Sequence, residues 1–251
     1  MSLSVDRFSS RIADYIKYRP GYPPEIVTLL KTECDLTIDS VVADIGSGTG
    51  KLTELFLANG NIVFGVEPNV GMRSAAEQIL QSSPNFNSIE GSAECTALRD
   101  SSIDFITAGQ AFHWFDPDNF KLEAKRILKA DGWVVIAWNA RKLISTPFLE
   151  DYEQLLLTYG TDYQDIRHEK AEDLIPKFFA PKSCHVAVFP NEQVFDFEGL
   201  KGRLRSSSYT PEPGHPGFEP MIDELRNVFN RHQKSGSVSF EYDTKVFYGQ
   251  L

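Results

Sequence analysis

The stretch VADIGSGTG, residues 42–50, decides the fold. Its first residues are apolar, and they end a β-branched run that predicts a short strand. Gly46, Gly48 and Gly50 then recur at every second position. Glycine lets a backbone turn sharply and lets a ligand lie against the main chain. A predicted helix follows at 50–60, so this loop joins a strand to a helix.

Strands and helices continue to alternate from residue 37 to residue 140. This alternation is typical of a parallel sheet with right-handed crossovers. The predicted strands are 37–46, 61–68, one in 85–94 that ends near Gly91, one in 101–115 that is followed by an aromatic turn, and 131–140. The predicted helices between them are 50–60, 69–81 and 118–129, the last capped by Asp116 or Asp118 with Pro117 in its first turn.

The flanking segments predict more helix and two further strands. Alternating apolar and polar residues at 237–251 indicate an edge or antiparallel strand. Helices are predicted at 4–18, 146–159, 165–180 and 197–207, and two more helices end at about Cys34 and at about residue 233. A strand with a turn is predicted at 183–197. We therefore expect an α/β, Rossmann-like fold: a seven-stranded, mainly parallel sheet with helices on both faces and an antiparallel last strand.

No clear linker divides the 251 residues, which predicts a single domain. In this interpretation residues 1–36 form N-terminal cap helices and residues 37–140 form the ligand-binding core. Residues 141–251 supply the last two strands and helical insertions that form a lid together with the N-terminal helix.

The glycine loop fits neither of two common nucleotide-binding patterns. A phosphate-binding P-loop needs a glycine where Ile45 stands and Ser or Thr where Leu52 stands. A dinucleotide fingerprint, G-x-G-x-x-G, needs its last glycine one position after Gly50. Asp44 precedes the loop, and its charge would repel a pyrophosphate but attract a cation. The pattern D-x-G-x-G-x-G therefore favours a positively charged ligand.

Glu67 closes the second predicted strand, 21 residues after Gly46. An acid at this spacing in a doubly wound fold accepts hydrogen bonds from both hydroxyl groups of a ribose. The alternative is a solvated acid at a strand end.

Composition limits the possible partners and location. The net charge of −10 and the pI of about 5.0 disfavour nonspecific nucleic-acid binding, because that affinity comes from Lys and Arg. The three separated cysteines indicate a reducing compartment rather than a disulfide framework, and no leader or membrane span is expected, so we predict a cytoplasmic protein. His168, His185 and His232 have no partners at metal-ligand spacing, which predicts no metal. The sequence is compatible with a monomer or a dimer.

Several stretches together resemble the class I S-adenosylmethionine-dependent methyltransferases. They are VADIGSGTG, VFGVEPN at 63–69 and the segment 90–116, which ends in AFHWFD. The chain is most similar to the UbiE-like and trans-aconitate-methyltransferase-like branch, which acts on small molecules. The segments 8–23, 205–216 and 241–251 are similar as well. The resemblance covers nearly the whole chain. Its motifs in the first half are specific for the cofactor, whereas nothing in the second half specifies a substrate.

The resemblance implies contacts with the methionine part of S-adenosylmethionine. Gly46, Ser47, Gly48 and Gly50 would form the bend under the cofactor, with Asp44 near the methionine amine. The remaining residues expected at this end are Gln110, facing the methionine part, and Tyr15 and Arg19, closing over the carboxylate.

The resemblance also implies contacts with the adenosine part. Glu67 would take the ribose hydroxyls, and Pro68 or Asn69 would lie against the adenine. Ser92 and Ala93 stand where the family contacts the adenine edge. Many relatives have Asp at the position of Ser92, so this contact is expected to be weaker, water-mediated or taken over by Glu94.

Methyl transfer is an in-line displacement in which the protein mainly positions the acceptor and excludes water. His113 is the candidate catalytic residue, as a base or as a hydrogen-bonding group, and the alternative is a residue that packs the loop. Trp114 and Tyr209 are the candidate acceptor-binding residues. Structural roles are the alternatives for these residues and their neighbours. Phe112, Trp114 and Phe115 suit the core equally well, and Tyr209 with Ser206–Ser208 suits an ordinary turn. Arg203, Arg205 and His215 could hold a carboxylate substrate, but a solvated face explains them equally well.

The predicted function is therefore methyl transfer from S-adenosylmethionine to a small-molecule acceptor, with an oxygen or carboxylate favoured as the acceptor. The products would be the methylated acceptor and S-adenosylhomocysteine. Two alternatives stay open at this point: a non-catalytic module that binds S-adenosylmethionine, and a nicotinamide-dependent oxidoreductase.

Overall fold

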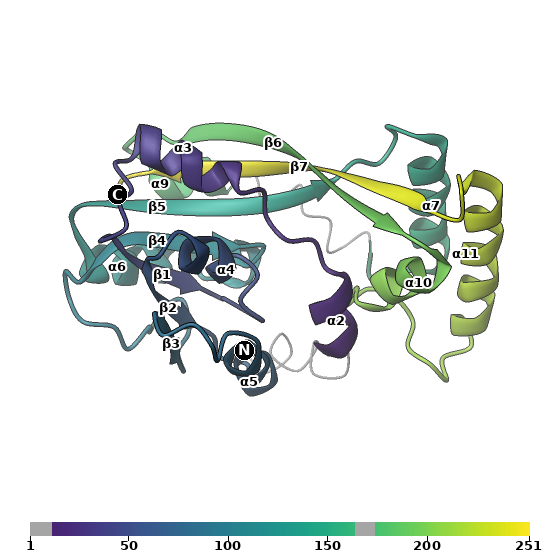
Figure 1. Cartoon of the computed structure of the whole chain (residues 1–251), viewed down its shortest axis with the longest axis horizontal. Helices are drawn as coiled ribbons and strands as arrows, with labels where there is room; N and C mark the ends of the chain where they lie inside the picture. The colour runs from purple at the N-terminus through teal and green to yellow at the C-terminus, as the bar shows by residue number, and fades with distance from the viewer. Residues whose placement is uncertain (1–11, 164–173) are drawn as a thin grey trace.

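A computed structural model describes residues 12–163 and 174–251. Its seven strands form one sheet in the order β3-β2-β1-β4-β5-β7-β6 (Figure 1). Strands β1 to β5 are parallel, whereas β7 runs antiparallel to both of its neighbours, β5 and β6. The strands are β1 (Val41–Ile45), β2 (Ile62–Val66), β3 (Phe86–Ile89), β4 (Ile103–Gly109), β5 (Leu128–Arg141), β6 (His185–Phe195) and β7 (Val238–Gly249).

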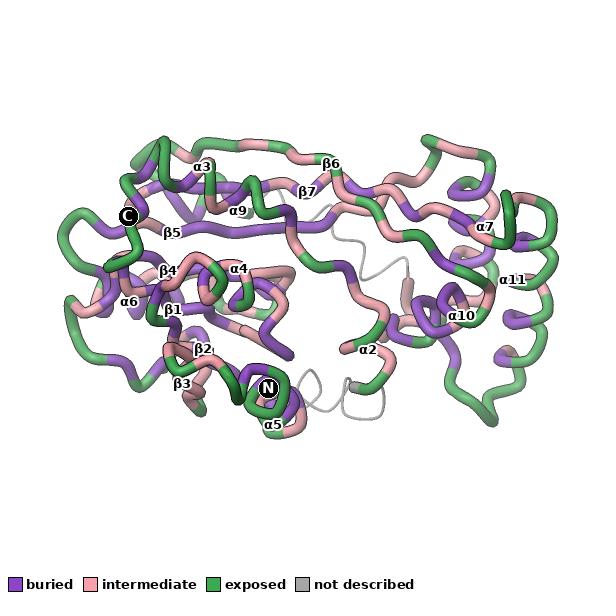
Figure 2. The backbone as a smooth tube through the Cα atoms, in the orientation of Figure 1, coloured by how far each residue is buried: buried purple, intermediate pink, exposed green. Residues whose placement is uncertain are grey.

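Apolar residues on both faces of the central strands hold the sheet between helices, as a parallel sheet requires. Val42 of β1 packs in one core with α3 (Glu25–Glu33) and α4 (Thr53–Ala58). Its neighbour Ala43 packs on the opposite face with α6 (Pro117–Ile127) and α9 (Ile175–Phe179). The successive residues point to opposite faces, and Figure 2 shows these central strands buried along most of their length.

Two helix starts carry the caps that their sequences supply. The side chain of Asn69 accepts a hydrogen bond from the backbone N–H of Met72 and caps α5 (Val70–Ile79). Asp116 caps α6 by accepting from the N–H groups of Asp118 and Asn119. Both caps satisfy N–H groups that have no partner within the helix, and they fix where the loops after β2 and β4 end.

The last three strands extend beyond the others and reach a second group of helices (Figure 1). These helices are α7 (Pro147–Tyr159), α10 (Phe197–Arg205) and α11 (Phe218–His232), and they share one apolar core with β7. Helix α2 (Ile12–Tyr18) lies against α10, where Asp14 pairs with Arg205. A Cβ at Gly202 would come within 2.0 Å of the Tyr18 ring, so the two helices touch where α10 has no side chain.

The structure confirms the predicted fold class: a seven-stranded Rossmann-like sheet, mostly parallel, with an antiparallel last strand. The predicted turn within 183–197 is wrong, because β6 is continuous and Pro190 pairs with Asp243. Proline is tolerated there because β6 is an edge strand. The β7 strand is antiparallel but not at the edge. β5 begins at Leu128, inside the predicted helix 118–129.

Parts of two predicted helices, 4–11 and 165–173, lie outside the described residues, as does His168. Within the described ranges, no helix has the length and apolar character needed to cross a membrane.

Candidate functional site

Two adjoining cavities open at the carboxyl ends of the parallel strands, where ligands bind in sheets of this type. The larger has a volume of about 400 Å³ and the smaller of about 60 Å³. The residues that line both are Tyr15, Arg19, Gly46, Gly48, Gly109 and Gln110.

The structure brings most of the predicted site residues to the larger cavity. They come from the N-terminal helix, from the loops after β1, β2, β3 and β4, and from the segment after α10. The predicted residues that line it are Tyr15, Arg19, Gly46, Gly48, Glu67, Pro68, Asn69, Ser92, Ala93, Glu94, Gln110, His113, Trp114 and Tyr209. Asp44 and Ser47 line the smaller cavity instead.

Gly50 lines neither cavity, in contrast to the other glycines of the loop. Its φ is +89°, and a Cβ there would come 2.7 Å from Cδ1 of Leu80. The requirement for glycine at this position therefore comes from packing behind the loop. The expected place of Gly50 in the bend under the ligand stays a prediction.

Gly46 and Gly48 shape the ligand side of the loop. Both have positive φ, +65° and +57°. A Cβ on Gly46 would lie 2.7 Å from the Cβ of Ala111, whereas a Cβ on Gly48 would meet nothing within 4 Å. The N–H groups of Gly46 and Ser47 both donate to the carbonyl of Val66, which ties the loop to the end of β2.

Glu67 is a buried acid, 8% exposed, so the alternative of a solvated side chain is wrong. Its Oε2 accepts from the N–H of Gly48 at 2.9 Å and its Oε1 from the N–H of Asn69 at 2.8 Å. Burial raises the pKa of Glu67, and these two hydrogen bonds oppose the rise. Each carboxylate oxygen has two lone pairs, so each can accept one more hydrogen bond.

Asp44 lies beneath the loop and is 1% exposed. Its Oδ2 accepts from the hydroxyl of Thr53 at 2.6 Å, and its Oδ1 accepts from the hydroxyl of Thr107 at 2.9 Å. Burial raises the pKa of Asp44 to about 6, against the two threonine hydrogen bonds, which lower it. Asp44 is therefore largely ionised at neutral pH.

Gln110 has a φ of +54°, which is uncommon for a residue with a side chain. Its N–H donates to the carbonyl of Ala137, and its Oε1 accepts from the N–H of Asn139 at 2.8 Å. Both ends of the residue are thus fixed to β5, which holds the strained backbone in place. Strain of this kind is often concentrated at functional sites.

His113 lies in a short 3₁₀ helix, η2 (Phe112–Trp114), directly after β4. Its ring is 4.4 Å from the ring of Trp114 and 5.2 Å from that of Trp138, measured between centroids. His113 therefore both lines the cavity and packs between two indole rings, so both predicted roles remain possible. Phe112 is 1% exposed and makes edge-to-face contacts with other aromatic rings, which makes it a core residue.

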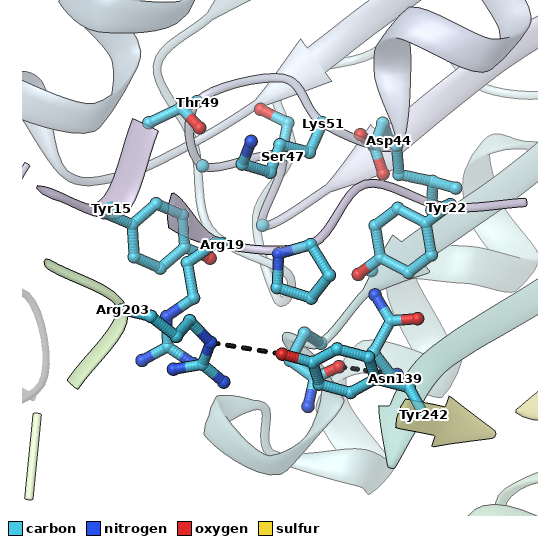
Figure 3. A pocket seen from close by; sticks show the side chains of 16 residues that line it. Tyr15, Arg19, Tyr22, Asp44, Ser47, Thr49, Lys51, Asn139, Arg203 and Tyr242 are labelled. Atoms are coloured by element: carbon cyan, nitrogen blue, oxygen red, sulfur yellow. Dashed lines mark hydrogen bonds between the residues drawn. The ribbon is translucent and has the colours of Figure 1, made fainter. Parts of the chain in front are cut away.

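Arg203 is 5% exposed, so the alternative of a solvated face is wrong for this residue. It donates to the hydroxyl groups of Tyr242 at 3.2 Å and Ser207 at 3.1 Å. Figure 3 shows it beside Arg19, which donates to the carbonyl of Ser206 at 2.7 Å. Among residues 12–163 and 174–251, no carboxylate pairs with either arginine.

Arg205 and His215, the other two residues considered for binding a carboxylate substrate, have structural partners. Arg205 is partly exposed and pairs with Asp14. Nδ1 of His215 accepts from the N–H of Gly217 within a turn. Tyr209 differs from both, because it lines the larger cavity. Burial raises the pKa of Tyr209, but the charges of Arg203, Arg19 and Arg141 outweigh it, so that the net shift is downward.

The sequence interpretation missed several residues of the smaller cavity, among them Tyr22, Lys51, Asn139 and Tyr242. Lys51 directly follows the glycine loop, and Asn139 lies near the carboxyl end of β5, so their positions were a usable signal. Tyr242 lies on the antiparallel strand opposite Arg141, and no local pattern indicates that pairing. Within the described part of the chain, no group of three His, Cys, Asp or Glu side chains is arranged to hold a metal.

Comparison with known proteins agrees with this geometry. Residues 43–136 match the family model of the methyltransferase domain. An uncharacterized methyltransferase of Schizosaccharomyces pombe is 29% identical over 244 residues, which cover 96% of this chain and 95% of the relative. This chain carries a methyltransferase domain.

Solved structures of methyltransferases share the fold of this chain over most of its length. A candidate type II methyltransferase from Anaeromyxobacter dehalogenans has a TM-score of 0.67 at 17% identity, covering 93% of this chain and 98% of that one. A phosphoethanolamine N-methyltransferase from Haemonchus contortus, solved with phosphomonomethylethanolamine and S-adenosylhomocysteine, has a TM-score of 0.53 at 14% identity, covering 96% of this chain and 56% of that one.

Proposed function

We propose that this methyltransferase uses S-adenosylmethionine and transfers its methyl group to a small-molecule acceptor. The observation that carries the proposal is the buried carboxylate of Glu67 beside the loop of Gly46 and Gly48, on the wall of the 400 Å³ cavity. Each Glu67 oxygen accepts one backbone N–H and has a lone pair left for one ribose hydroxyl. The Haemonchus enzyme, which has a similar fold, holds S-adenosylhomocysteine.

The other predicted contacts follow from this placement. Pro68 and Asn69 would lie against the adenine, and the segment Ser92–Glu94 would meet its edge. Glu94 accepts from the N–H of Asp116 at 2.9 Å, so one of its oxygens is already engaged in holding the loop. At the other end, Asp44 would face the methionine amine and Arg19 the carboxylate.

The bound cofactor would supply an activated methyl group on its sulfonium, so the residues around it need only orient the acceptor and exclude water. Gln110 has a fixed side chain and lines both cavities, which suits a residue that positions the methionine part. His113, Trp114 and Tyr209 line the larger cavity, where the acceptor would lie. If the acceptor is a hydroxyl, His113 is the group placed to accept its proton.

An oxygen or carboxylate acceptor fits the charges at the Tyr209 wall of the larger cavity better than an ammonium group does. The positive charges of Arg203, Arg19 and Arg141 outweigh burial and lower the pKa of Tyr209, which supports a positive field at this wall. Such a field stabilises a negatively charged oxygen nucleophile and repels an ammonium group.

Isothermal titration calorimetry with S-adenosylhomocysteine and with NAD tests the cofactor assignment. Binding of NAD without binding of S-adenosylhomocysteine would overturn it. A screen of small carboxylates, phenols and quinols with labelled S-adenosylmethionine then tests the acceptor class. Transfer to amines alone would contradict the preference for oxygen, and tight cofactor binding without any transfer would favour a non-catalytic binding module.

A further inference from the structure

Two arginines from distant parts of the chain border the smaller cavity, together with Lys51, whose ammonium group donates to the carbonyl of Ile16. Arg19 directly follows α2, and Arg203 lies in α10. Burial and the charge of Arg203 lower the pKa of Arg19, so the two guanidinium groups repel each other. Removing a charge from water is costly unless an opposite charge or hydrogen bonds compensate. The pair therefore favours an anion in the space that both arginines border.

Two buried polar atoms of this cavity also have no hydrogen-bond partner. They are Nε of Arg19 and Oγ1 of Thr49, and both residues line the cavity. Thr49 belongs to the glycine loop and is 3% exposed. In Figure 3 Thr49 and Ser47 lie on the side opposite to the arginine pair. Buried polar groups are nearly always hydrogen-bonded in folded proteins, so these two atoms indicate a place for a polar ligand group.

The size and the charges of the cavity define that group. A space of about 60 Å³ accommodates a small polar end group but not a second organic substrate. Asp44 lines the same cavity as the arginine pair. Lys51 lines it as well, so the charged groups of the wall are three cations and one acid. A group that carries both a carboxylate and an ammonium, as the end of an amino acid does, matches such a wall.

We propose that Arg203 acts with Arg19 to hold the carboxylate of the methionine part of S-adenosylmethionine, so that the bound cofactor joins α2 to α10. The inference rests on the proposed function and adds a cofactor-binding residue from the C-terminal half of the chain. Arginine suits this role because its planar group donates two parallel hydrogen bonds to a carboxylate. The ammonium group faces Asp44, and the acceptor occupies the larger cavity beside His113 and Tyr209.

The bound cofactor then strengthens the contact between α2 and α10 that covers one end of its site. Without an anion, the two arginines repel each other across the contact between α2 and α10. A carboxylate between them turns this repulsion into attraction on both sides. A ligand that lacks the carboxylate occupies the adenosine part but leaves the repulsion between the two arginines in place.

Calorimetric titration with S-adenosylhomocysteine and with 5′-methylthioadenosine, which has no amino-acid end, tests the inference. Arg19→Met and Arg203→Met should each weaken binding of S-adenosylhomocysteine by roughly tenfold or more and leave that of 5′-methylthioadenosine within about twofold. Arg205→Met is the matched control, because Arg205 lies on the same helix and contacts α2 through Asp14 without lining the cavity. It should change neither affinity.

Unchanged affinity of a folded Arg203→Met variant for S-adenosylhomocysteine would overturn the inference. If the wild-type chain binds neither ligand, the proposed function itself fails. Hydrogen exchange of the wild-type chain gives a test that does not depend on a folded variant. S-adenosylhomocysteine should slow exchange in both α2 and α10, whereas 5′-methylthioadenosine should not. Equal protection by the two ligands, or protection of α2 alone, would contradict a carboxylate bridge.

Discussion

The Oε2 atom of Glu67 accepts a hydrogen bond from the backbone N–H of Gly48 at 2.9 Å. The acid at the end of β2 and the glycine loop after β1 are therefore one unit. Glu67→Ala would leave this N–H and that of Asn69 without their acceptor, as well as removing the contact expected with the ribose. We expect S-adenosylhomocysteine to bind less tightly by about 1–3 kcal/mol, measured by calorimetry.

Glu90→Ala is the control for Glu67→Ala, because Glu90 is an exposed acid at the end of β3 that pairs with Arg73. It should bind the ligand like the wild type. Unchanged affinity of Glu67→Ala would exclude the ribose contact.

Asp44 should make cofactor binding depend on pH. Burial raises the pKa of Asp44 to about 6, so its carboxylate becomes neutral as pH falls through that value. The attraction for the methionine ammonium is then present above pH 6 and lost below it. The affinity for S-adenosylhomocysteine, measured between pH 8 and pH 5, should fall in this window, and Asp44→Asn should flatten the profile.

The affinity for 5′-methylthioadenosine should show no such loss, because this ligand has no ammonium group. An equal loss for both ligands would assign the pH dependence to another group, such as Glu67, whose pKa is also raised by burial.

Gly46→Ala should distort the loop beyond the ordinary cost of a side chain at positive φ. The new Cβ would lie 2.7 Å from the Cβ of Ala111, and neither atom is the end of a flexible side chain. Gly214→Ala is the control, with a φ of +93° and open space around it, and should cost only about 1–2 kcal/mol. Urea unfolding should show a larger loss for Gly46→Ala, with a loss of ligand affinity that Gly214→Ala lacks. Equal losses of stability in the two variants would mean that Ala111 shifts to make room for the new Cβ.

His113→Ala separates the two roles that the site allows for this residue. If His113 accepts a proton, turnover should fall by roughly a hundredfold or more with little change in affinity for S-adenosylhomocysteine. His185→Ala is the control, since this histidine stacks on Tyr248 at the far end of the sheet. A drop in thermal stability with normal turnover would show that His113 only packs against Trp114 and Trp138.

The parallel half of the fold could be predicted from sequence because β1, β2 and β4 are short, largely apolar runs, each with a helix after it. The predictions failed where tertiary context decides. Nothing local shows that Pro190 lies in an edge strand, where the lack of an N–H is tolerated. Leu128 follows a helical pattern without a turn signal, yet it begins β5.

The candidate site could be predicted as far as residues follow strands directly, as Glu67 and Gln110 do. Spacing alone could not show that Gly50 faces Leu80 rather than the cavity. It also could not distinguish Arg203 from Arg205, two positions apart on α10, because which arginine is buried depends on β7 packing against that helix.

The contact between α2 and α10 depends on the absence of a side chain at Gly202, so the residue type at this position indicates in any aligned sequence whether the contact can form. The Tyr18 ring occupies the space where a side chain at position 202 would begin. A homologue with a larger residue there cannot bring its N-terminal helix against α10 along the same path. Such a chain must cover its cofactor with other residues or leave one end open, so the residue type at this single position sorts relatives by how their site is closed.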